Sequence, residues 1–386
     1  ILAIPIQLGL PQLVVRETAK ADAAGEPAAM KVLWRWAHFI VALAAAIILS
    51  IVSASVIFLG SGPASPDVLA RGLLLLPMIA FGRIRGAALR GLGRVVLGQL
   101  PEALLRPLFF VILILVVSFV YGNKITASTA MTLHVFAAAL AFAVGTILLY
   151  QNAPKSNGDR SKPPLHRRWL ISASILGFTD GLQVLNHNLD LVMLGFLSSD
   201  ELVGIYKIAT AGAGFVAFGL QAMTVVIMTR VSSLHASGDT KALQALVTSA
   251  TRIVVLTAFV ATVGLVAVGR PLLGFVFGDE YRAAYPALII LAIGQFGFAA
   301  IGPVGMLLNM SGHERDTLRG VAVACLANVV LNLTLIPMFG INGAAIATVT
   351  TLLIWHLQLA HSVAQRLGIH SSVIKLFSIP LGPMDR

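Results

Sequence analysis

The chain has few charged residues, few acidic residues and only one cysteine. Asp, Glu, Lys and Arg make up 11% of its 386 residues, whereas 58% are hydrophobic. A typical soluble domain has about 25% charged residues, so this chain could not cover a water-facing surface. Cys325 has no second cysteine to pair with, which excludes a disulfide within the chain.

Acidic residues are scarce relative to basic ones, 16 against 27, which gives a formal net charge of +11. In a soluble protein this excess would suggest nucleic acid. Here, however, 20 of the 27 Lys and Arg residues fall in every second gap between long apolar segments. Basic loops near span ends stay cytoplasmic and face anionic head groups. The pattern therefore predicts a multi-pass membrane protein with a defined orientation and no nucleic-acid partner.

Motifs of catalysis and metal binding are missing as well. There is no G-x-x-x-x-G-K-[ST] loop for ATP, no H-E-x-x-H pair and no nucleophile–base constellation in the sequence. We therefore expect a protein that is not an enzyme and that uses neither a cofactor nor a metal.

Ten apolar segments are long enough to cross a membrane, which takes about 20 residues, and one further segment is partial. The partial span is Ile1–Val15. The full spans are Trp36–Leu59, Val68–Ile84, Leu97–Tyr121, Ala127–Tyr150, Trp169–Leu197, Leu202–Thr229, Leu243–Val268, Ala284–Met310, Leu318–Phe339 and Gly343–Val363.

The segments divide into two related halves. The sequence Leu89-Arg90-Gly-Leu-Gly-Arg94 resembles Leu308-Asn-Met-Ser-Gly-His313, and a second weak match shares nearly the same offset. Both partners of each match lie at basic ends, so we expect parallel repeats. This offset places one span and part of the next before the first residue. We expect an incomplete first lobe at 1–150, a cytoplasmic linker at 151–168, a six-span lobe at 169–366 and a cytoplasmic tail at 367–386.

Polar residues interrupt the span Trp169–Leu197 at helical spacing. Asp180, Gln183, His187 and Asp190 are three, four and three residues apart and form one stripe, and Asn186 lies beside it. Hydrogen bonding between helices is the simpler interpretation. We favour a water-filled cavity, because an ionisable group at mid-membrane is costly without a partner or water. Asp180 or Asp190 could then carry a proton or another cation.

Three basic residues lie inside spans. Lys207 either snorkels to the interface or provides a cation for an anionic substrate or for Asp190. Arg106 lies between two prolines and has Glu102 four residues before it, so an ion pair within the helix is the simpler interpretation and a kinked cavity wall the alternative. Arg252 either snorkels or lines the cavity. The candidate cavity residues are thus Asp180, Gln183, Asn186, His187, Asp190, Lys207, Arg106 and Arg252.

Short motifs of the second half resemble a known family. They are Asp190-Leu-Val-Met-Leu-Gly195, Val203-Gly-Ile-Tyr206, Phe277-Gly278 with Tyr281, Ser311-Gly-His-Glu314 and Ile336-Pro-Met-Phe-Gly-Ile-Asn-Gly-Ala-Ala-Ile-Ala-Thr348. In order and spacing these are similar to the polysaccharide biosynthesis (O-antigen or teichoic acid flippase) family of the multidrug/oligosaccharidyl-lipid/polysaccharide exporter superfamily. The similarity runs from about Leu8 to Leu367.

The resemblance implies an all-α, MATE-like transmembrane bundle with two pseudo-symmetric six-helix lobes around a cavity that opens alternately to each side. It implies a flippase for an oligosaccharide carried on undecaprenyl pyrophosphate, in a bacterial or archaeal cell (inner) membrane with a cytoplasmic C-terminus. Coupling to H⁺ or Na⁺ and contact with other polysaccharide-assembly proteins fit this expectation. Two alternatives stay open: a cation-coupled multidrug exporter of the same fold, and a non-transporting fragment.

Overall fold

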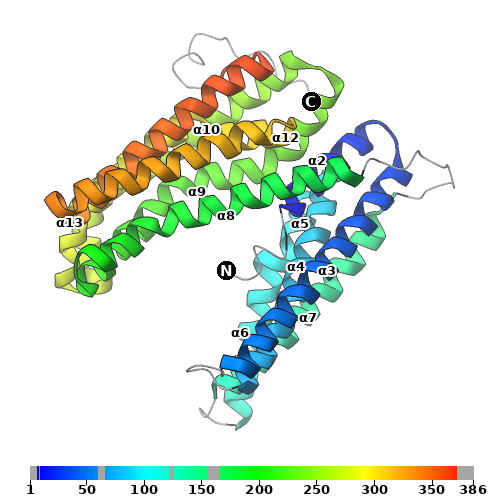
Figure 1. Cartoon of the computed structure of the whole chain (residues 1–386), viewed down its shortest axis with the longest axis horizontal. Coiled ribbons are helices and arrows are strands. Elements are labelled where there is room, and N and C mark those ends of the chain that lie inside the picture. Colours follow the sequence, from blue (N-terminus) through cyan, green and yellow to red (C-terminus); the bar gives the residue numbers. More distant parts are fainter. Residues whose placement is uncertain (1–6, 8, 60–65, 122–125, 155–165, 372–386) are drawn as a thin grey trace. The chain divides into compact units, whose positions relative to one another are not determined.

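The computed structural model describes residues 7, 9–59, 66–121, 126–154 and 166–371, and every regular element among them is helical. The chain divides into two compact units, Ile1–Gly177 and Phe178–Arg386 (Figure 1). The boundary falls inside helix α8 (His166–Leu197). Residues 155–165 of the expected linker and residues 372–386 of the expected tail lie outside the described residues.

Eight helices of the described residues are long and apolar enough to cross a membrane. The ten expected full spans differ from these eight in two places. Helix α13 (Glu314–Leu367) contains two expected spans, Leu318–Phe339 and Gly343–Val363. Helix α8 is long enough, but the polar residues along it lower its hydropathy below that of the other helices.

The helices pack as in membrane proteins, with large apolar side chains outside and small residues inside. Large apolar side chains point outward, for example Phe119 at 93% and Phe275 at 90% exposure. Small residues occupy the interior: α7 (Ala127–Asn152) buries Ala137, Ala138 and Ala141. Lipid tails are as apolar as these side chains, so membrane helices associate through small residues that allow close approach. The chain is therefore a multi-pass membrane protein.

The first unit contains α2 (Leu10–Ala23), α3 (Pro27–Leu59), α4 (Pro66–Gly91), α5 (Val95–Leu100), α6 (Arg106–Tyr121), α7 and the start of α8. Helix α4 packs against α2, α3 and α7, and α6 packs against α7. Helix α4 continues seven residues beyond the expected end of its span at Ile84. The basic segment expected as a gap at Arg83–Arg94 is therefore mostly helical.

A π-helical turn, η1 (Pro101–Leu105), joins α5 to α6. The sequence predicts an irregularity here, because Pro101 and Pro107 each lack the N–H that a regular helix uses. In the structure this irregularity is a single wider, π-helical turn, and the helix continues on both sides of it. Single π-turns of this kind occur frequently at functional sites.

The second unit contains the rest of α8, then α9 (Asp200–Ser237), α10 (Thr240–Phe277), the 3₁₀ turn η2 (Asp279–Ala284), α11 (Tyr285–Ile301), α12 (Val304–Met310) and α13. Helices α9, α10 and α11 pack against one another, and α13 packs against α11 and α12. The start of α9 is encoded locally: the Ser199 side chain accepts a hydrogen bond from the Leu202 N–H, and Asp200 and Glu201 follow in the first turn.

One glycine breaks an expected span, and another separates two expected spans. The span expected at Ala284–Met310 is broken at Gly302, where φ is +87° and Pro303 follows. Helix α13 changes direction at Gly340, where φ is +56°. Gly343 lies so close to the Leu335 carbonyl oxygen that a Cβ atom would collide with it. The residues around Gly340 therefore separate the two spans that the sequence predicts.

Candidate functional site

The polar stripe expected on α8 lies on one continuous helix, as its spacing predicts, but its members differ in environment. Asp190 is buried and His187 is exposed, although they are three residues apart. Asp180, Gln183 and Asn186 are partly exposed, and the Asn186 Oδ1 atom is buried without a hydrogen-bond partner among the described residues. The stripe therefore extends from the packed interior of the second unit to its surface.

Asp190 is held by two hydroxyl groups from two other helices. The Tyr206 hydroxyl of α9 donates to Asp190 Oδ2 at 2.7 Å, and the Thr348 hydroxyl of α13 donates to the same oxygen at 2.8 Å. Asp190 is 2% exposed and Tyr206 is 0% exposed. The other carboxylate oxygen, Oδ1, is buried and accepts no hydrogen bond from the described residues. The cluster links α8, α9 and α13 inside an apolar core. It leaves Asp190 Oδ1 without a hydrogen-bond donor from the described residues.

Tyr206 and Thr348 were not among the candidate residues from the sequence. They are 16 and 158 residues from Asp190, so helical spacing along α8 cannot reveal them. A signal was present nevertheless. Both residues end motifs that carry the family resemblance, Val203-Gly-Ile-Tyr206 and the long motif that ends at Thr348.

Lys207 and Arg252 also belong to the second unit. Lys207 is exposed on α9, and its carbonyl oxygen accepts a hydrogen bond from Thr210 at 2.8 Å. Among the ion pairs of the described residues, none joins its ammonium group to Asp190. Arg252 is partly exposed on α10. The structure thus brings Asp190 together with Tyr206 and Thr348, and not with Lys207.

Arg106 lies in the first unit, at the C-terminal end of the π-turn. Its Nη1 atom is 3.5 Å from Glu102 Oε2, which is the ion pair within the helix that the sequence favours. Both side chains are about three-quarters buried or more, at 24% and 18% exposure. The Glu102 carboxylate also lies against Gly82 of α4, where a Cβ atom would collide with it. Glycine at position 82 thus makes room for an acidic side chain between two helices.

Two arginines of α4 add positive charge to this region. Arg83 donates to the Gln7 side chain at 3.3 Å and lies close enough to Glu102 to interact with it electrostatically. Arg85 stacks over the Phe142 ring of α7, with its Cζ atom 3.6 Å from the ring centroid. The sequence assigned Arg83 and Arg85 to a basic gap. Because α4 continues through them, both lie on a packed helix, Arg83 near Glu102 and Arg85 against Phe142.

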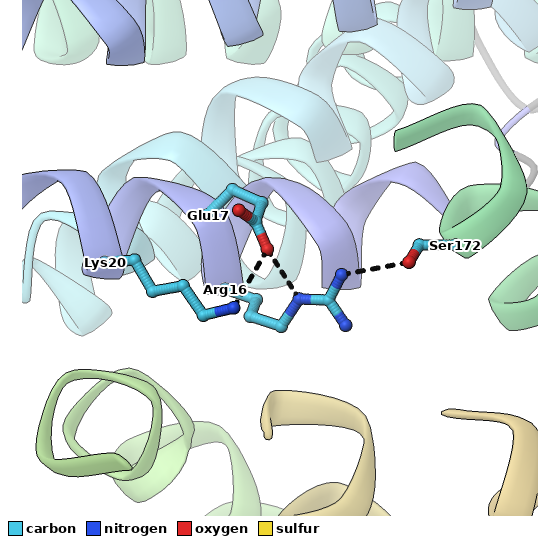
Figure 2. A network of polar contacts seen from close by, with 4 residues as sticks. All are labelled: Arg16, Glu17, Lys20 and Ser172. Carbon is cyan, nitrogen blue, oxygen red and sulfur yellow. Dashed lines mark hydrogen bonds and ion pairs between the residues drawn. The ribbon is translucent and has the colours of Figure 1, made fainter. Parts of the chain in front are cut away.

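A second buried arginine ties α2 to the start of α8. The Arg16 side chain is 5% exposed, and its Nε atom donates to Glu17 Oε1 at 2.8 Å (Figure 2). Lys20 contacts the same oxygen at 3.2 Å. The Nη2 atom of Arg16 donates to Ser172 Oγ at 3.2 Å. This network compensates the buried charge and fixes the first turns of α8 within the first unit.

Solved structures with the same fold are membrane transporters. A mutant form of the Vibrio cholerae MATE transporter VcmN superposes with a TM-score of 0.76 at 16% identity over 95% of this chain and 87% of that one. A MOP superfamily transporter from Pyrococcus furiosus gives a TM-score of 0.81 at 10% identity over 95% and 85%. At these identities the likeness shows the fold, which is that of MATE-like transporters.

The chain belongs to the polysaccharide biosynthesis protein family, whose model matches residues 1–213. Two relatives from Haloferax volcanii are similar in sequence. One is the probable flippase AglR, 28% identical over 187 residues, 47% of this chain and 39% of that protein. The other is the probable low-salt glycan biosynthesis flippase Agl15, 28% identical over 163 residues, 42% and 34%. The matches thus span well under half the length of these relatives. Membership of this family points to a transporter rather than an enzyme.

Proposed function

We propose that the chain flips a lipid-linked oligosaccharide across the cell membrane for cell-surface polysaccharide biosynthesis, by alternating access. The match of residues 1–213 to the polysaccharide biosynthesis family carries this proposal. The two relatives named as probable flippases support it. The MATE-like fold supports a transporter built from two units that change their relative arrangement.

The charges of the first unit suit an anionic head group. A lipid-linked oligosaccharide on undecaprenyl pyrophosphate carries negative charge next to the lipid, and arginine binds phosphate oxygens in a forked geometry. Arg83 and Arg106 provide two guanidinium groups beside one carboxylate, Glu102, and Arg85 adds a third on the same helix as Arg83. We infer that Arg106 exchanges its contact with Glu102 for a contact with the substrate phosphate.

Asp190 is the residue best placed to bind a coupling ion. Two hydroxyl groups donate hydrogen bonds to Oδ2, whereas the buried Oδ1 has no donor among the described residues. A proton or Na⁺ at Oδ1 would compensate the remaining charge. Asp180, partly exposed on the same helix face, is the second acidic group available. We place the C-terminus in the cytoplasm, where contact with other polysaccharide-assembly proteins would occur.

A flipping assay with two variants tests this function. The full chain is placed in vesicles with a fluorescent lipid-linked oligosaccharide, and loss of outer-leaflet probe is followed with a membrane-impermeant quencher. We expect flipping above protein-free vesicles and a drop of about tenfold for Arg106→Gln, since one lost charge-assisted contact costs about 1.5 kcal/mol or more. Vesicles that flip no faster than protein-free controls would refute the proposal.

The double variant Glu102→Gln/Arg106→Gln separates a substrate contact from a structural pair. It removes both charges, so no uncompensated carboxylate is left between the helices. A substrate-binding arginine predicts that the double variant stays as slow as Arg106→Gln. Recovery of wild-type flipping in the double variant would show that Arg106 only neutralises Glu102, and the site would then need reassignment.

A cation-coupled multidrug exporter is the second candidate. The superposition with a MATE transporter and the buried carboxylate of Asp190 favour it. Expression of the chain in a drug-sensitive host distinguishes the two. An exporter lowers the accumulation of a cationic dye and loses this activity in Asp190→Asn. A lipid-linked oligosaccharide flippase leaves dye accumulation unchanged.

A further inference from the structure

A cavity of about 420 Å³ lies between α3 and α7 at the basic end of the first unit. Its lining residues are Lys31, Trp34, Arg35, His38 and Leu149. Four of the five come from the first turns of α3, and Leu149 comes from the last turns of α7. Neither the family match nor the relatives assign a role to this cavity.

The two cations of the cavity are free of acidic partners. Lys31 and Arg35 are four residues apart, so their side chains lie on the same face of α3. Neither forms an ion pair with a carboxylate in the part of the chain that the structure describes. Glu17 of α2 pairs with Arg16 and Lys20 instead. The cavity therefore presents two uncompensated positive charges.

The aromatic side chains of the cavity are fixed as walls. The Trp34 Nε1 atom donates to Thr18 Oγ1 at 2.9 Å, and His38 Nδ1 lies 2.7 Å from the Trp34 carbonyl oxygen, to which it donates. The His38 ring also stacks on Phe81, with centroids 5.8 Å apart. Because Trp34 Nε1 and His38 Nδ1 already have acceptors within the protein, Lys31 and Arg35 are the charged groups that the cavity presents to an anionic ligand.

Aromatic residues place the cavity at the depth of lipid head groups. The chain has four tryptophans, and three of them, Trp34, Trp36 and Trp169, gather here, with the Trp36 and Trp169 ring centroids 5.4 Å apart. Tyr150, the residue after Leu149, is 86% exposed. Tryptophan and tyrosine are enriched where a membrane protein meets the head groups.

An exposed apolar ridge leads from the cavity along α3. It continues from Arg35 in steps of four residues and is made of Phe39, Leu43, Ile47 and Ile51, which are 65%, 50%, 52% and 61% exposed. Residues four apart are neighbours on a helix surface, and each step turns about 40° around the axis, so the row winds along α3. A molecule bound by its head at Lys31 and Arg35 could therefore lay a hydrocarbon chain along this ridge.

We propose that this cavity is a binding site for an anionic phospholipid. Lys31 and Arg35 hold the phosphate of the head group, Trp34 and His38 form the wall behind it, and one acyl chain runs along the ridge of α3. Charge complementarity selects this occupant, because the leaflet at the basic gaps is rich in anionic lipids and basic pockets between membrane helices bind their head groups. The proposal does not depend on which substrate the chain transports.

Native mass spectrometry of the full chain in detergent tests the site, with phosphatidylglycerol as the probe. A basic residue near the membrane surface contributes about 1 kcal/mol to anionic lipid binding, and 1.4 kcal/mol is a factor of ten. We therefore expect Lys31→Gln/Arg35→Gln to weaken the first bound phosphatidylglycerol about 30-fold. The exchange Lys31→Arg/Arg35→Lys, which keeps both charges, is expected to change the affinity less than about threefold, because it costs only head-group geometry.

The control is Arg230→Gln/Lys241→Gln, which removes two exposed basic residues from the second unit. Equal weakening by the site variant and by this control would overturn the proposal, because net charge alone would then explain binding. An unchanged affinity in the site variant would overturn it as well. If millimolar inorganic phosphate displaces the lipid from the wild-type chain, the site binds free phosphate and the lipid assignment fails. Equal binding of phosphatidylcholine would also contradict it.

Discussion

Replacement of Tyr206 by Phe removes one hydroxyl and leaves the ring in place. The ring is fully buried in an apolar cluster that includes Leu194, Ala209 and Leu288, and phenylalanine fills nearly the same space. What is lost is the hydrogen bond of 2.7 Å to Asp190 Oδ2. No solvent reaches this position to replace it, so the substitution isolates one hydrogen bond between α9 and α8.

The expected cost follows from the acceptor. Hydrogen bonds to charged groups contribute about 1.5–3 kcal/mol in soluble proteins, whereas side-chain bonds between membrane helices average about 0.6 kcal/mol and reach at most about 1.7. The short distance and complete burial place Tyr206 near the upper membrane value. We expect Tyr206→Phe to lower the free energy of unfolding by about 1.5 kcal/mol.

Tyr285→Phe provides the matched control. The Tyr285 hydroxyl donates to the Val266 carbonyl oxygen, also at 2.7 Å, but the acceptor is neutral and the bond is exposed. Its loss should cost about 0.6 kcal/mol. Unfolding in mixed detergent micelles, followed by circular dichroism, measures both variants. The two equilibrium constants should differ about fivefold, since 1.4 kcal/mol is a factor of ten. If both substitutions cost the same, Asp190 is not a special acceptor and the reasoning fails.

Three further perturbations follow from the second unit. Combining Tyr206→Phe with Thr348→Val should cost about 1 kcal/mol more than the sum of the single variants, because the buried carboxylate then keeps no donor; a double-mutant cycle in micelles gives this value, and strict additivity contradicts it. Gly343→Ala should destabilise by about 2 kcal/mol, because its Cβ would collide with a backbone carbonyl oxygen; a melting temperature equal to wild type would argue against this. Gln244→Ala removes two hydrogen bonds of 2.8 Å, one to the His370 N–H and one to the His370 carbonyl oxygen. Hydrogen exchange at the His370 N–H should then accelerate about tenfold. An unchanged exchange rate would show that Gln244 does not protect this amide.

The sequence predicts the membrane helices well and their ends poorly. Long apolar runs with basic gaps locate the spans, because the hydrophobic thickness of a bilayer fixes their length. The helix itself does not stop where the bilayer does. Arg83 and Arg85 follow a span of α4, yet backbone hydrogen bonding continues through them to Gly91. Charge marks the membrane boundary, whereas a glycine with positive φ, as at Gly302, ends a helix.

Some features of the candidate site could likewise be predicted from the sequence and others could not. Spacing within one helix is visible in the sequence, so the Glu102–Arg106 pair and the polar row of α8 are predicted. Contacts between helices are not visible, because they depend on how distant segments pack. The hydroxyl partners of Asp190 are of this kind. The role of the remaining candidates, Lys207 and Arg252 among them, stays a prediction.

The environment of Asp190 constrains how it can take part in transport. Thr348 Oγ1 has a single hydrogen and three oxygens within reach: Asp190 Oδ2 at 2.8 Å, the Ala344 carbonyl oxygen at 3.0 Å and the Tyr206 hydroxyl oxygen at 3.3 Å. When the carboxylate gains a proton or a cation, its hydrogen bond with the Thr348 hydroxyl weakens. The hydroxyl can then rotate and donate to the Ala344 carbonyl oxygen without a movement of the backbone. Ala344 lies one residue beyond Gly343, next to the bend of α13. One hydroxyl rotation would therefore connect a change of charge at α8 to the bend of α13.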